Sequence, residues 1–323
     1  MLVISKEEQK SLINMQEIIS LVEKALVAFS SGETQTPIRT ALPFNNEENT
    51  ALFMPSIAEN LNSLGIKVVN VVPGNKPLNK HTINGLVLLS DMKTGEPAAL
   101  LEGSYITKVR TGALSGVATK YLAREDARVL GIIGSGEQAK GVCEAILTVR
   151  EIDEIYVYNR TKNKAELFAS YFMENFGMKV EILSNANEVV EHADIIVTAT
   201  NAHEPVYSTA LKKGVHINAV GSFRPDMQEI PSSTILSAEK VVVESKDAAL
   251  EETGDLKKPI NEGFPEKSIF ELGEIINSIR KGRTNDQEIT VFKSVGLAIV
   301  DIVVGQYIFE RAVESGIGLE IHL

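Results

Sequence analysis

The stretch Val129-Leu130-Gly131-Ile132-Ile133-Gly134-Ser135-Gly136-Glu137-Gln138-Ala139 decides the fold of this chain. Its apolar run predicts a buried strand, the pattern Gly-x-Gly-x-x-Ala predicts a tight turn, and residues 138–149 predict a helix. Gly134 permits the turn, Gly136 lets backbone N–H groups approach a pyrophosphate, and Ala139 keeps the helix close to the strand. The N-terminus of that helix favours phosphate through its partial positive charge. The stretch therefore predicts a dinucleotide-binding turn, and the alternative is a turn with a structural role alone.

Strands and helices alternate after this turn, which predicts a parallel, doubly wound sheet. Unbroken apolar runs, typical of strands buried on both faces, are found at residues 129–133, 155–158, 179–182, 195–198, 216–220 and 240–243. Residues 289–312 then predict one long helix that returns the chain to its first domain. The tail, residues 316–323, is expected to add a strand there.

The first 120 residues follow another pattern, a helical region and then short strands. Ser5 and Glu8 form a capping box that opens the helical region, and Gly32 helps to end it. Antiparallel strands beside a helix are typical of a separate α+β domain. The strands are expected at residues 38–42, 50–54, 65–72, 82–90 and 98–101, and a helix at 105–123. We therefore expect an α/β protein in which a Rossmann domain, residues 121–299, is inserted in an α+β domain formed by 1–120 and 300–323.

Composition and charge exclude several classes of protein. The net charge of -11 argues against general binding of nucleic acid or of anionic membranes. Cys143 is the single cysteine, which excludes an internal disulfide and indicates a cytoplasmic location. The apolar run 295–304 is interrupted by Asp301 and is too short to span a bilayer. His, Cys and carboxylates show no metal-ligand spacing, so no metal site is expected.

Three cations of the first domain lie where apolar side chains are expected. Arg110 is centred in the apolar stripe of the expected helix, Lys67 lies on an apolar strand face, and Arg39 lies in a strand. A buried guanidinium needs an anionic partner. Each cation could pair with an internal carboxylate or reach water. Three of them beside a dinucleotide-binding domain favour a pocket for a substrate carboxylate, which Arg binds bidentately and Lys binds as a point charge or proton relay.

Five motifs along nearly the whole chain resemble the ornithine cyclodeaminase/mu-crystallin family. They are Phe53-Met54-Pro55, Gly65-Ile66-Lys67-Val68-Val69-Asn70, Val109-Arg110-Thr111-Gly112-Ala113, Gly134-Ser135-Gly136-Glu137-Gln138-Ala139 and Phe292-Lys293-Ser294-Val295-Gly296. The resemblance implies a Rossmann domain inserted in a substrate-binding domain, and a homodimer formed largely through the substrate-binding domains. It also implies that Arg39, Lys67 and Arg110 bind the carboxylate of a small amino or imino acid. Thr82 is then expected near the nicotinamide, and Lys67, Arg110 and Thr82 are the expected catalytic residues. We expect the three cations to converge on one cleft that faces the nicotinamide.

Two positions depart from the branch that names the family. Ornithine cyclodeaminases resemble one another in a Glu before the Leu-Met-Pro segment and in an acid/base Asp after the fifth Rossmann strand. Leu52 and Phe223 stand at these positions, and neither can transfer a proton. Arg224-Pro225-Asp226 instead resembles the loop of mu-crystallin and the ketimine reductases.

The expected function is therefore NADPH-dependent reduction of a cyclic ketimine carboxylate, yielding proline from pyrroline-2-carboxylate or pipecolate from piperideine-2-carboxylate. Three alternatives stay open. They are an ornithine cyclodeaminase, an alanine or other amino-acid dehydrogenase, and a non-catalytic protein that, like mu-crystallin, binds NADPH and a small ligand.

NADP(H) is the expected cofactor, with NAD(H) as the alternative. NAD sites of this fold usually end the second strand in Asp or Glu, whereas this strand ends in Asn159, followed by Arg160, Thr161 and Lys162. A guanidinium, a hydroxyl and an ammonium suit a 2′-phosphate, and Thr161 can also cap the next helix. The residues expected to bind the dinucleotide are Gly134, Ser135, Gly136, Glu137, Gln138, Ala139, Asn159, Arg160, Thr161, Thr198, Ala199, Thr200, Val220, Gly221, Ser222, Ser294 and Gly296.

Overall fold

The computed structural model describes residues 1–46, 48–75, 77–78 and 80–322, which form two compact units. The first unit consists of Met1–Arg110 and Leu297–Leu323, and the second consists of Thr111–Gly296. The second unit is thus inserted in the sequence of the first. The boundaries expected from the sequence, after residues 120 and 299, lie further along the chain, and helix α3 (Gly103–Leu122) continues past the first observed boundary.

After strand β1 (Leu2–Ile4), the first unit has two helices in place of one helical region. Helix α1 (Lys6–Leu12) begins with the predicted capping box: Ser5 N donates to Glu8 Oε2 at 2.7 Å, and Glu8 N donates to Ser5 Oγ at 3.5 Å. Helix α2 (Met15–Ser30) is a separate helix with Asn14 as its N-cap. Asn14 Oδ1 accepts a hydrogen bond from Gln16 N at 3.0 Å.

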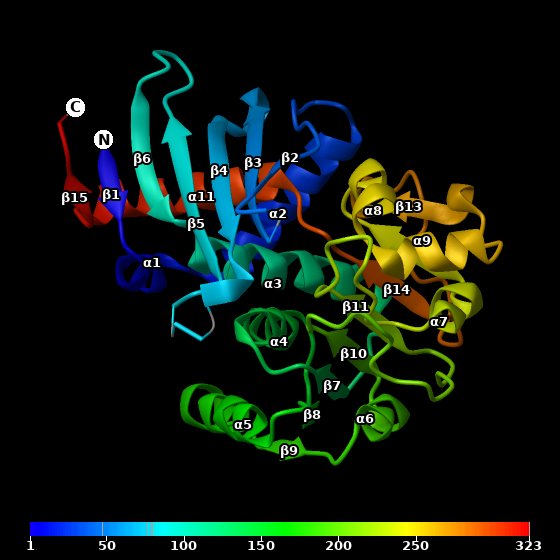
Figure 1. The fold of residues 1–323 in the computed structure, drawn as a ribbon. Helices are drawn as coiled ribbons and strands as arrows, with labels where there is room; N and C mark the ends of the chain where they lie inside the picture. The colour runs from blue at the N-terminus through cyan, green and yellow to red at the C-terminus, as the bar shows by residue number, and fades with distance from the viewer. Residues whose placement is uncertain (47, 76, 79, 323) are drawn as a thin grey trace. The chain divides into compact units, whose positions relative to one another are not determined.

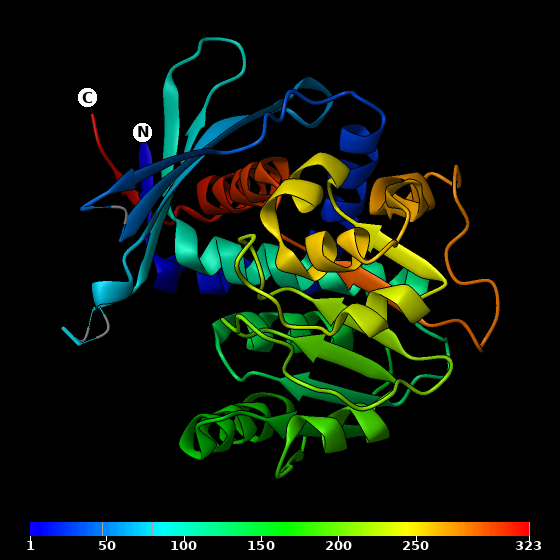
Figure 2. The ribbon, with the colours of Figure 1, turned by 45° about the vertical axis from the view of Figure 1, so that its right-hand side comes forward.

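A seven-stranded sheet forms the body of the first unit (Figure 1), in the order β15-β1-β6-β5-β4-β3-β2. The strands are β1 (Leu2–Ile4), β2 (Thr40–Phe44), β3 (Asn49–Ala58), β4 (Ser63–Val71), β5 (Ile83–Ser90), β6 (Pro97–Glu102) and β15 (Leu319–Glu320). Strands β2 to β6 pair antiparallel, as predicted. The predicted tail strand is confirmed as β15, which pairs with β1, while Leu323 lies outside the described residues. Helix α11 (Ala298–Ser315) lies along one face of this sheet, as Figure 2 shows.

The predicted helix over residues 289–312 is wrong in its first part. Thr290–Lys293 forms strand β14, and the helix begins only at Ala298. The run Thr-Val-Phe-Lys has β-branched and aromatic side chains, which favour a strand. Gly296 then adopts φ +99°, a left-handed conformation that no helix continues through.

The second unit is built on an eight-stranded sheet in which all pairings are parallel, in the order β13-β12-β14-β11-β10-β7-β8-β9. The six predicted strands are confirmed, and β13 and β14 are additional. The strands are β7 (Val129–Ile133), β8 (Glu154–Tyr158), β9 (Val180–Ile182), β10 (Ile195–Thr198), β11 (His216–Ala219), β12 (Lys240–Val243), β13 (Ile269–Glu271) and β14. The order of strands along the chain reverses between β7 and β10, which is where ligands bind in open α/β sheets.

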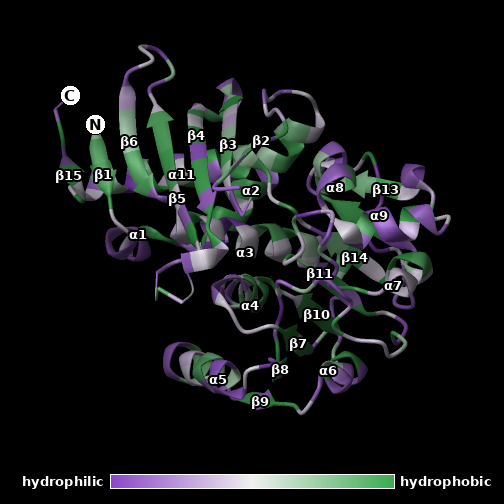
Figure 3. Ribbon diagram, viewed as in Figure 1, coloured by the Kyte–Doolittle hydropathy of each residue, from purple (hydrophilic) through white to green (hydrophobic). Residues whose placement is uncertain are grey.

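Helices cover both faces of this sheet and enclose two apolar cores. One core packs α4 (Glu137–Val149) and α5 (Lys162–Phe176) on the strands, through side chains such as Phe168. The other packs residues of the remaining helices on the opposite face: α6 (Ala186–His192), α7 (Ser232–Ser237), α8 (Lys246–Glu252) and α9 (Gly254–Asn261), with α10 (Leu272–Ile276) following β13. Figure 3 shows the central strands as mainly hydrophobic, and α5 with both hydrophobic and hydrophilic residues. The predicted doubly wound α/β architecture is confirmed.

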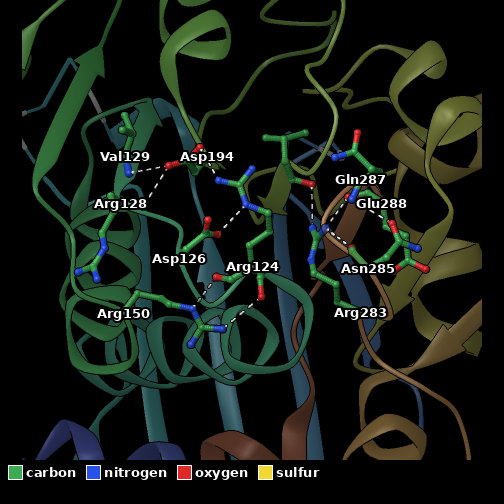
Figure 4. A network of polar contacts seen from close by, with 12 residues as sticks. Arg124, Asp126, Arg128, Val129, Arg150, Asp194, Arg283, Asn285, Gln287 and Glu288 are labelled. Carbon is green, nitrogen blue, oxygen red and sulfur yellow. Dashed lines mark hydrogen bonds and ion pairs between the residues drawn. The ribbon is translucent and has the colours of Figure 1, made fainter.

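Arginines secure the C-terminal end of α3 at the amino edge of the parallel sheet (Figure 4). Arg150 Nη2 donates to Thr119 O at 3.0 Å and to Ala123 O at 3.2 Å, and Arg283 Nε donates to Leu122 O at 2.6 Å. The last carbonyls of a helix lack partners within it, and cations favour that end. Two guanidinium groups therefore satisfy the end of α3.

Among the described residues, no helix is long and apolar enough to cross a membrane.

Candidate active site

Two of the three predicted cations meet at one carboxylate in the first unit. Lys67 Nζ, on β4, donates to Asp301 Oδ1 at 2.6 Å, and Arg110 Nε, on α3, donates to the same oxygen at 3.1 Å. Lys67 is 2% exposed, Arg110 7% and Asp301 0%. Asp301 had not been predicted as a site residue. Its signal in the sequence was a single carboxylate within an apolar run, a position that only a cationic partner makes tolerable.

A hydroxyl and two further charges surround the Lys67 ammonium. Nζ also donates to Thr107 Oγ1 at 2.6 Å, and that hydroxyl in turn donates to Gly103 O at 2.7 Å. Burial lowers the pKa of Lys67 to about 8; the charge of Asp301 opposes this fall, and the charges of Arg110 and Arg39 add to it. An ammonium with this pKa can release a proton close to neutral pH.

Arg39 lies directly before β2 and is half-buried. Thr40 pairs with Phe53 and Phe53 pairs with Val68, so Arg39 is level with Lys67 two strands away. Adjacent strands are about 4.8 Å apart, and the Arg39 charge acts on Lys67 across two such spacings.

The structure thus gathers Arg39, Lys67 and Arg110 in one region of the first unit. The alternative of an internal ion pair also holds in part, because Asp301 neutralises one of these positive charges. Lys67 and Arg110 share the single carboxylate of Asp301, so these three residues together have one positive charge in excess. That it faces the nicotinamide stays a prediction.

Thr82, the third predicted catalytic residue, lies apart from this cluster. It directly precedes β5, and its backbone oxygen accepts from Val72 N at 2.7 Å. Val72 lies five residues beyond Lys67 along the same extended segment, which corresponds to roughly 16 Å.

The glycine turn of the second unit has the predicted geometry. Gly134 adopts φ +94°, and a Cβ on it would lie 2.5 Å from Ala199 O. Gly134 N donates to Tyr158 O at 2.9 Å. The turn therefore joins the carboxyl ends of β7, β8 and β10, and only glycine fits its first position.

The space beside the N-terminus of α4 suits a phosphate. Gly136 is the N-cap, and a Cβ on it would meet no atom within 4 Å. The Ser135 hydroxyl is buried, and no described residue forms a hydrogen bond with it. The first N–H groups of any helix lack partners within the helix. Unused donors beside an open glycine are what a pyrophosphate requires, so these residues fit the expected dinucleotide.

Asn159 links this turn to the loop after β8. Its Oδ1 accepts from Ser135 N at 3.3 Å, and its Nδ2 donates to Thr161 O at 2.9 Å. Arg160, Thr161 and Lys162 are exposed. Thr161 occupies the N-cap position of α5, but its side chain forms no capping hydrogen bond with the described residues.

Two buried glutamates, neither of them predicted, hold the neighbouring strand ends. Glu229 accepts hydrogen bonds from groups after β10 and β11: Thr198 Oγ1 at 3.3 Å, Thr200 N at 2.5 Å, Thr200 Oγ1 at 2.8 Å, Gly221 N at 2.6 Å and Ser222 N at 3.1 Å. Glu244 Oε1 accepts from Ser294 Oγ at 3.0 Å and from Gly296 N after β14. Ala199 N and Val220 N donate to neighbouring strand carbonyls, Ile133 O and Thr198 O, both at 2.9 Å.

Asp255, which forms a buried ion pair with Lys293, contacts the backbone of Glu229. Asp255 Oδ1 accepts from Glu229 N at 2.7 Å, and Lys293 Nζ lies 3.0 Å from Asp255 Oδ2. Burial raises the pKa of Glu229, and the Lys293 charge opposes the rise. All the predicted dinucleotide-binding residues thus lie at the carboxyl edge of adjacent parallel strands or at the start of α4, where a dinucleotide binds in this architecture.

Both positions that depart from the cyclodeaminase pattern carry apolar side chains in the structure. Leu52 lies on β3 opposite Val69, and Phe223 lies in the loop between β11 and α7. Neither position supplies a carboxylate.

Residues 1–316 match the ornithine cyclodeaminase/mu-crystallin family. The chain is 62% identical over 323 residues to a Delta(1)-pyrroline-2-carboxylate reductase of Bacillus cereus (strain ZK / E33L), with 99% of each chain covered. It resembles the solved structure of Thermococcus litoralis Delta(1)-pyrroline-2-carboxylate reductase in complex with NADH and L-proline, at 40% identity and TM-score 0.96, covering 99% of this chain and 100% of that one. It also resembles an archaeal alanine dehydrogenase dimer with bound NAD, at 33% identity and TM-score 0.93, covering 100% and 99%. The chain therefore belongs to the ornithine cyclodeaminase/mu-crystallin family.

Proposed function

We propose that this protein is an NADPH-dependent reductase of cyclic ketimine carboxylates that converts Δ1-pyrroline-2-carboxylate to proline, with piperideine-2-carboxylate as a second substrate. The observation that carries the proposal is the buried group of Lys67, Arg110 and Asp301 with Arg39 beside it. Its excess positive charge suits an anionic substrate, and Lys67 suits proton transfer. The 62% identity to a pyrroline-2-carboxylate reductase supports the same substrate class.

Arg39 and Arg110 bind and orient the substrate carboxylate in this proposal. A bidentate or paired guanidinium contact restricts the rotation of a planar carboxylate, so that the C=N carbon is presented in one orientation. Lys67 lies in the same cluster and gives its proton to the imine nitrogen, directly or through one water molecule.

A reduced dinucleotide held at this site would supply one hydride to the C=N carbon. As that C–H bond forms, the π electron pair moves to nitrogen, and the Lys67 ammonium releases one proton to the same atom. Lys67 then regains its proton from solvent. The proton from Lys67 makes the C=N carbon electrophilic, so this chemistry needs no further carboxylic acid, in agreement with Leu52 and Phe223.

The dinucleotide is held by the glycine turn and by the strand ends that follow it. The backbone N–H groups at the start of α4 and the Ser135 hydroxyl bind the pyrophosphate. Asn159, Arg160 and Thr161 bind the ribose, and its 2′-phosphate when present; the strand ends held by Glu229 and Glu244 support the remainder. An uncharged Asn159 followed by an exposed Arg160 favours NADP(H) over NAD(H), because no carboxylate there repels the phosphate.

A homodimer through the uncovered sheet face of the first unit is part of the proposal. Thr40, Phe53, Val68 and Leu86 are aligned across four strands, so they share the face opposite Lys67. Leu42 and Phe44 share it by strand alternation, and Leu42 and Leu86 are 51% and 50% exposed. Such an apolar face indicates a protein contact, and the related archaeal alanine dehydrogenase is a dimer. We also propose a cytoplasmic location, because the single Cys143 cannot form an internal disulfide.

A panel of substrates tests the proposed reaction. The purified chain is incubated with NADPH or NADH and with each of pyrroline-2-carboxylate, piperideine-2-carboxylate, and pyruvate plus ammonia, while oxidation of the cofactor is followed. We expect the cyclic imines to react fastest and proline to be recovered from the five-membered ring. Faster turnover of pyruvate plus ammonia would instead indicate an alanine dehydrogenase, and binding without turnover would indicate a non-catalytic protein. Ornithine with NAD should release little or no ammonia; efficient release would contradict the proposal.

A further inference from the structure

We propose that Asp301 is a positioning residue that keeps the buried Lys67 ammonium charged and holds it in place as a proton donor. The catalytic consequence rests on the function proposed above. The effect on Lys67 itself does not, because it concerns a side chain that is buried in the protein without substrate.

The geometry places Asp301 as the anion of the cluster. A single oxygen, Oδ1, accepts from Lys67 Nζ at 2.6 Å and from Arg110 Nε at 3.1 Å. Oδ2 is also buried, and no described residue forms a hydrogen bond with it. Asp301 therefore sits between two cations in a region without solvent, where an uncompensated charge costs most.

The groups that face Lys67 can be assigned element by element. Helix α3 contributes Arg110 and the Thr107 hydroxyl, and the segment before β2 contributes the charge of Arg39. On the flanking strands, Lys67 is paired with apolar residues, Met54 on β3 and Val87 on β5. Helix α11 contributes Asp301. Of the groups found here among the described residues, Asp301 alone favours the charged form of Lys67 through an opposite charge.

Loss of that charge should therefore convert the donor to a neutral amine. Without Asp301, a fully buried ammonium would face two guanidinium groups and one neutral hydroxyl. Burial and like charges both lower the pKa of a lysine, so Nζ would give up its proton to solvent below neutral pH. A neutral amine has no proton to donate to an imine nitrogen.

Four variants separate the charge of Asp301 from its hydrogen bond. Asp301→Asn keeps the shape and removes the charge, whereas Asp301→Glu keeps the charge. Thr107→Val removes the other hydrogen-bond acceptor of Lys67 Nζ without a change in charge. Lys67→Met removes the titrating group itself, so the NMR signal that disappears in this variant is assigned to Lys67.

The direct readout is the titration of Lys67 in the protein without substrate, followed by NMR of its isotope-labelled side chain. We expect Asp301→Asn to lower the pKa of Lys67 by about 1–3 units, Asp301→Glu to restore most of it, and Thr107→Val to change it much less. Equal shifts in Asp301→Asn and Thr107→Val would overturn the inference. So would a wild-type Lys67 that is already neutral at pH 7, a measurement that needs no variant to fold.

The kinetic readout is the pH profile of kcat/KM for reduction of the cyclic imine. The rate should fall on the alkaline side as Lys67 loses its proton. Asp301→Asn should move that fall to lower pH, and Lys67→Met should leave only the titration of the substrate. An unmoved profile in a folded Asp301→Asn variant would overturn the positioning role while the reductase function stands. If the wild type reduces no cyclic imine, the proposed function fails, and the NMR titration still decides the role of Asp301.

Discussion

Gly112 of α3 and Gly141 of α4 are in direct backbone contact: a Cβ on Gly112 would lie 2.2 Å from Gly141 O. Both residues belong to the second unit, and α4 is the helix that follows the dinucleotide turn. The position of the turn thus depends on two helices that cross without side chains between them.

Gly112→Ala should therefore destabilise the protein. A methyl group at this position cannot be accommodated without displacing backbone, and overpacking of this kind costs about 1–3 kcal/mol. Urea unfolding of wild type and variant measures the loss. Gly74→Ala is the matched control, because a Cβ on Gly74 would meet no atom within 4 Å. Equal stability of the two variants would contradict the contact.

Arg110→Ala should lower kcat/KM for the cyclic imine severely and change NADPH binding less. Loss of a charge-assisted contact costs about 1.5–3 kcal/mol, which corresponds to roughly 10- to 100-fold. Arg311→Ala is the control, since Arg311 is an exposed arginine paired with Glu17 on the surface. If Arg110→Ala and Arg311→Ala have the same kcat/KM, Arg110 does not bind the substrate.

Arg160→Ala should weaken NADPH binding by roughly 10- to 100-fold and leave NADH binding almost unchanged, because only NADPH carries the 2′-phosphate. Fluorescence titration with each cofactor measures both affinities. Lys179→Ala is the control, because this exposed lysine precedes β9 at the opposite, amino edge of the same sheet. A wild-type protein that prefers NADH would refute the assignment of the phosphate site.

Glu229→Gln should weaken the binding of both cofactors. The carboxylate accepts from the backbone N–H groups of Thr200, Gly221 and Ser222, and a side-chain amide would turn a second donor toward at least one of them. Leaving buried donors without an acceptor costs about 1–3 kcal/mol, so the strand ends should loosen. Calorimetric titration measures the affinity, with the exposed Glu204→Gln as control. Unchanged affinity for both cofactors would show that Glu229 does not support the site.

His216 should make the protein less stable in acid. It is fully buried at the start of β11, and burial first, then the charge of Arg283, lowers its pKa from 6.5 to about 3. Between these two values the unfolded chain binds a proton that the folded chain does not, so stability falls as pH drops from 6.5 toward 3. The full loss from this residue is on the order of 5 kcal/mol.

Urea unfolding at several pH values, with His216→Gln beside the wild type, isolates this contribution. The difference in stability between the two proteins should narrow as pH falls through 6.5. A difference that stays constant between neutral and acid pH would contradict the buried, neutral state of His216.

The sequence alone predicted the features that depend on neighbouring residues. The glycine turn, the bounds of β7 and the capping box of Ser5 and Glu8 all follow from spacings of a few residues, because a strand, a tight turn and a helix cap are formed by adjacent parts of the chain. The apolar stripe around Arg110 belongs to the same class, since a helix places every third or fourth residue on one face. These patterns also carried the family resemblance.

The tertiary structure decided which distant charges meet and where an ambiguous segment goes. Lys67 and Asp301 are 234 residues apart in the sequence, and nothing in either segment names the other as its partner. The same holds for β14: the periodicity of a short apolar run does not separate a helix from a strand, and in the fold this run pairs between β11 and β12. In the sequence, Glu229 has no feature that distinguishes it from an exposed polar loop residue. In the fold, the ends of β10 and β11 donate hydrogen bonds to its carboxylate. No local pattern reveals that Asp301 and Glu229 are buried in the folded chain. Because they are buried, Asp301 pairs with the cations of its own site, and Glu229 accepts hydrogen bonds from the strand ends of its own site.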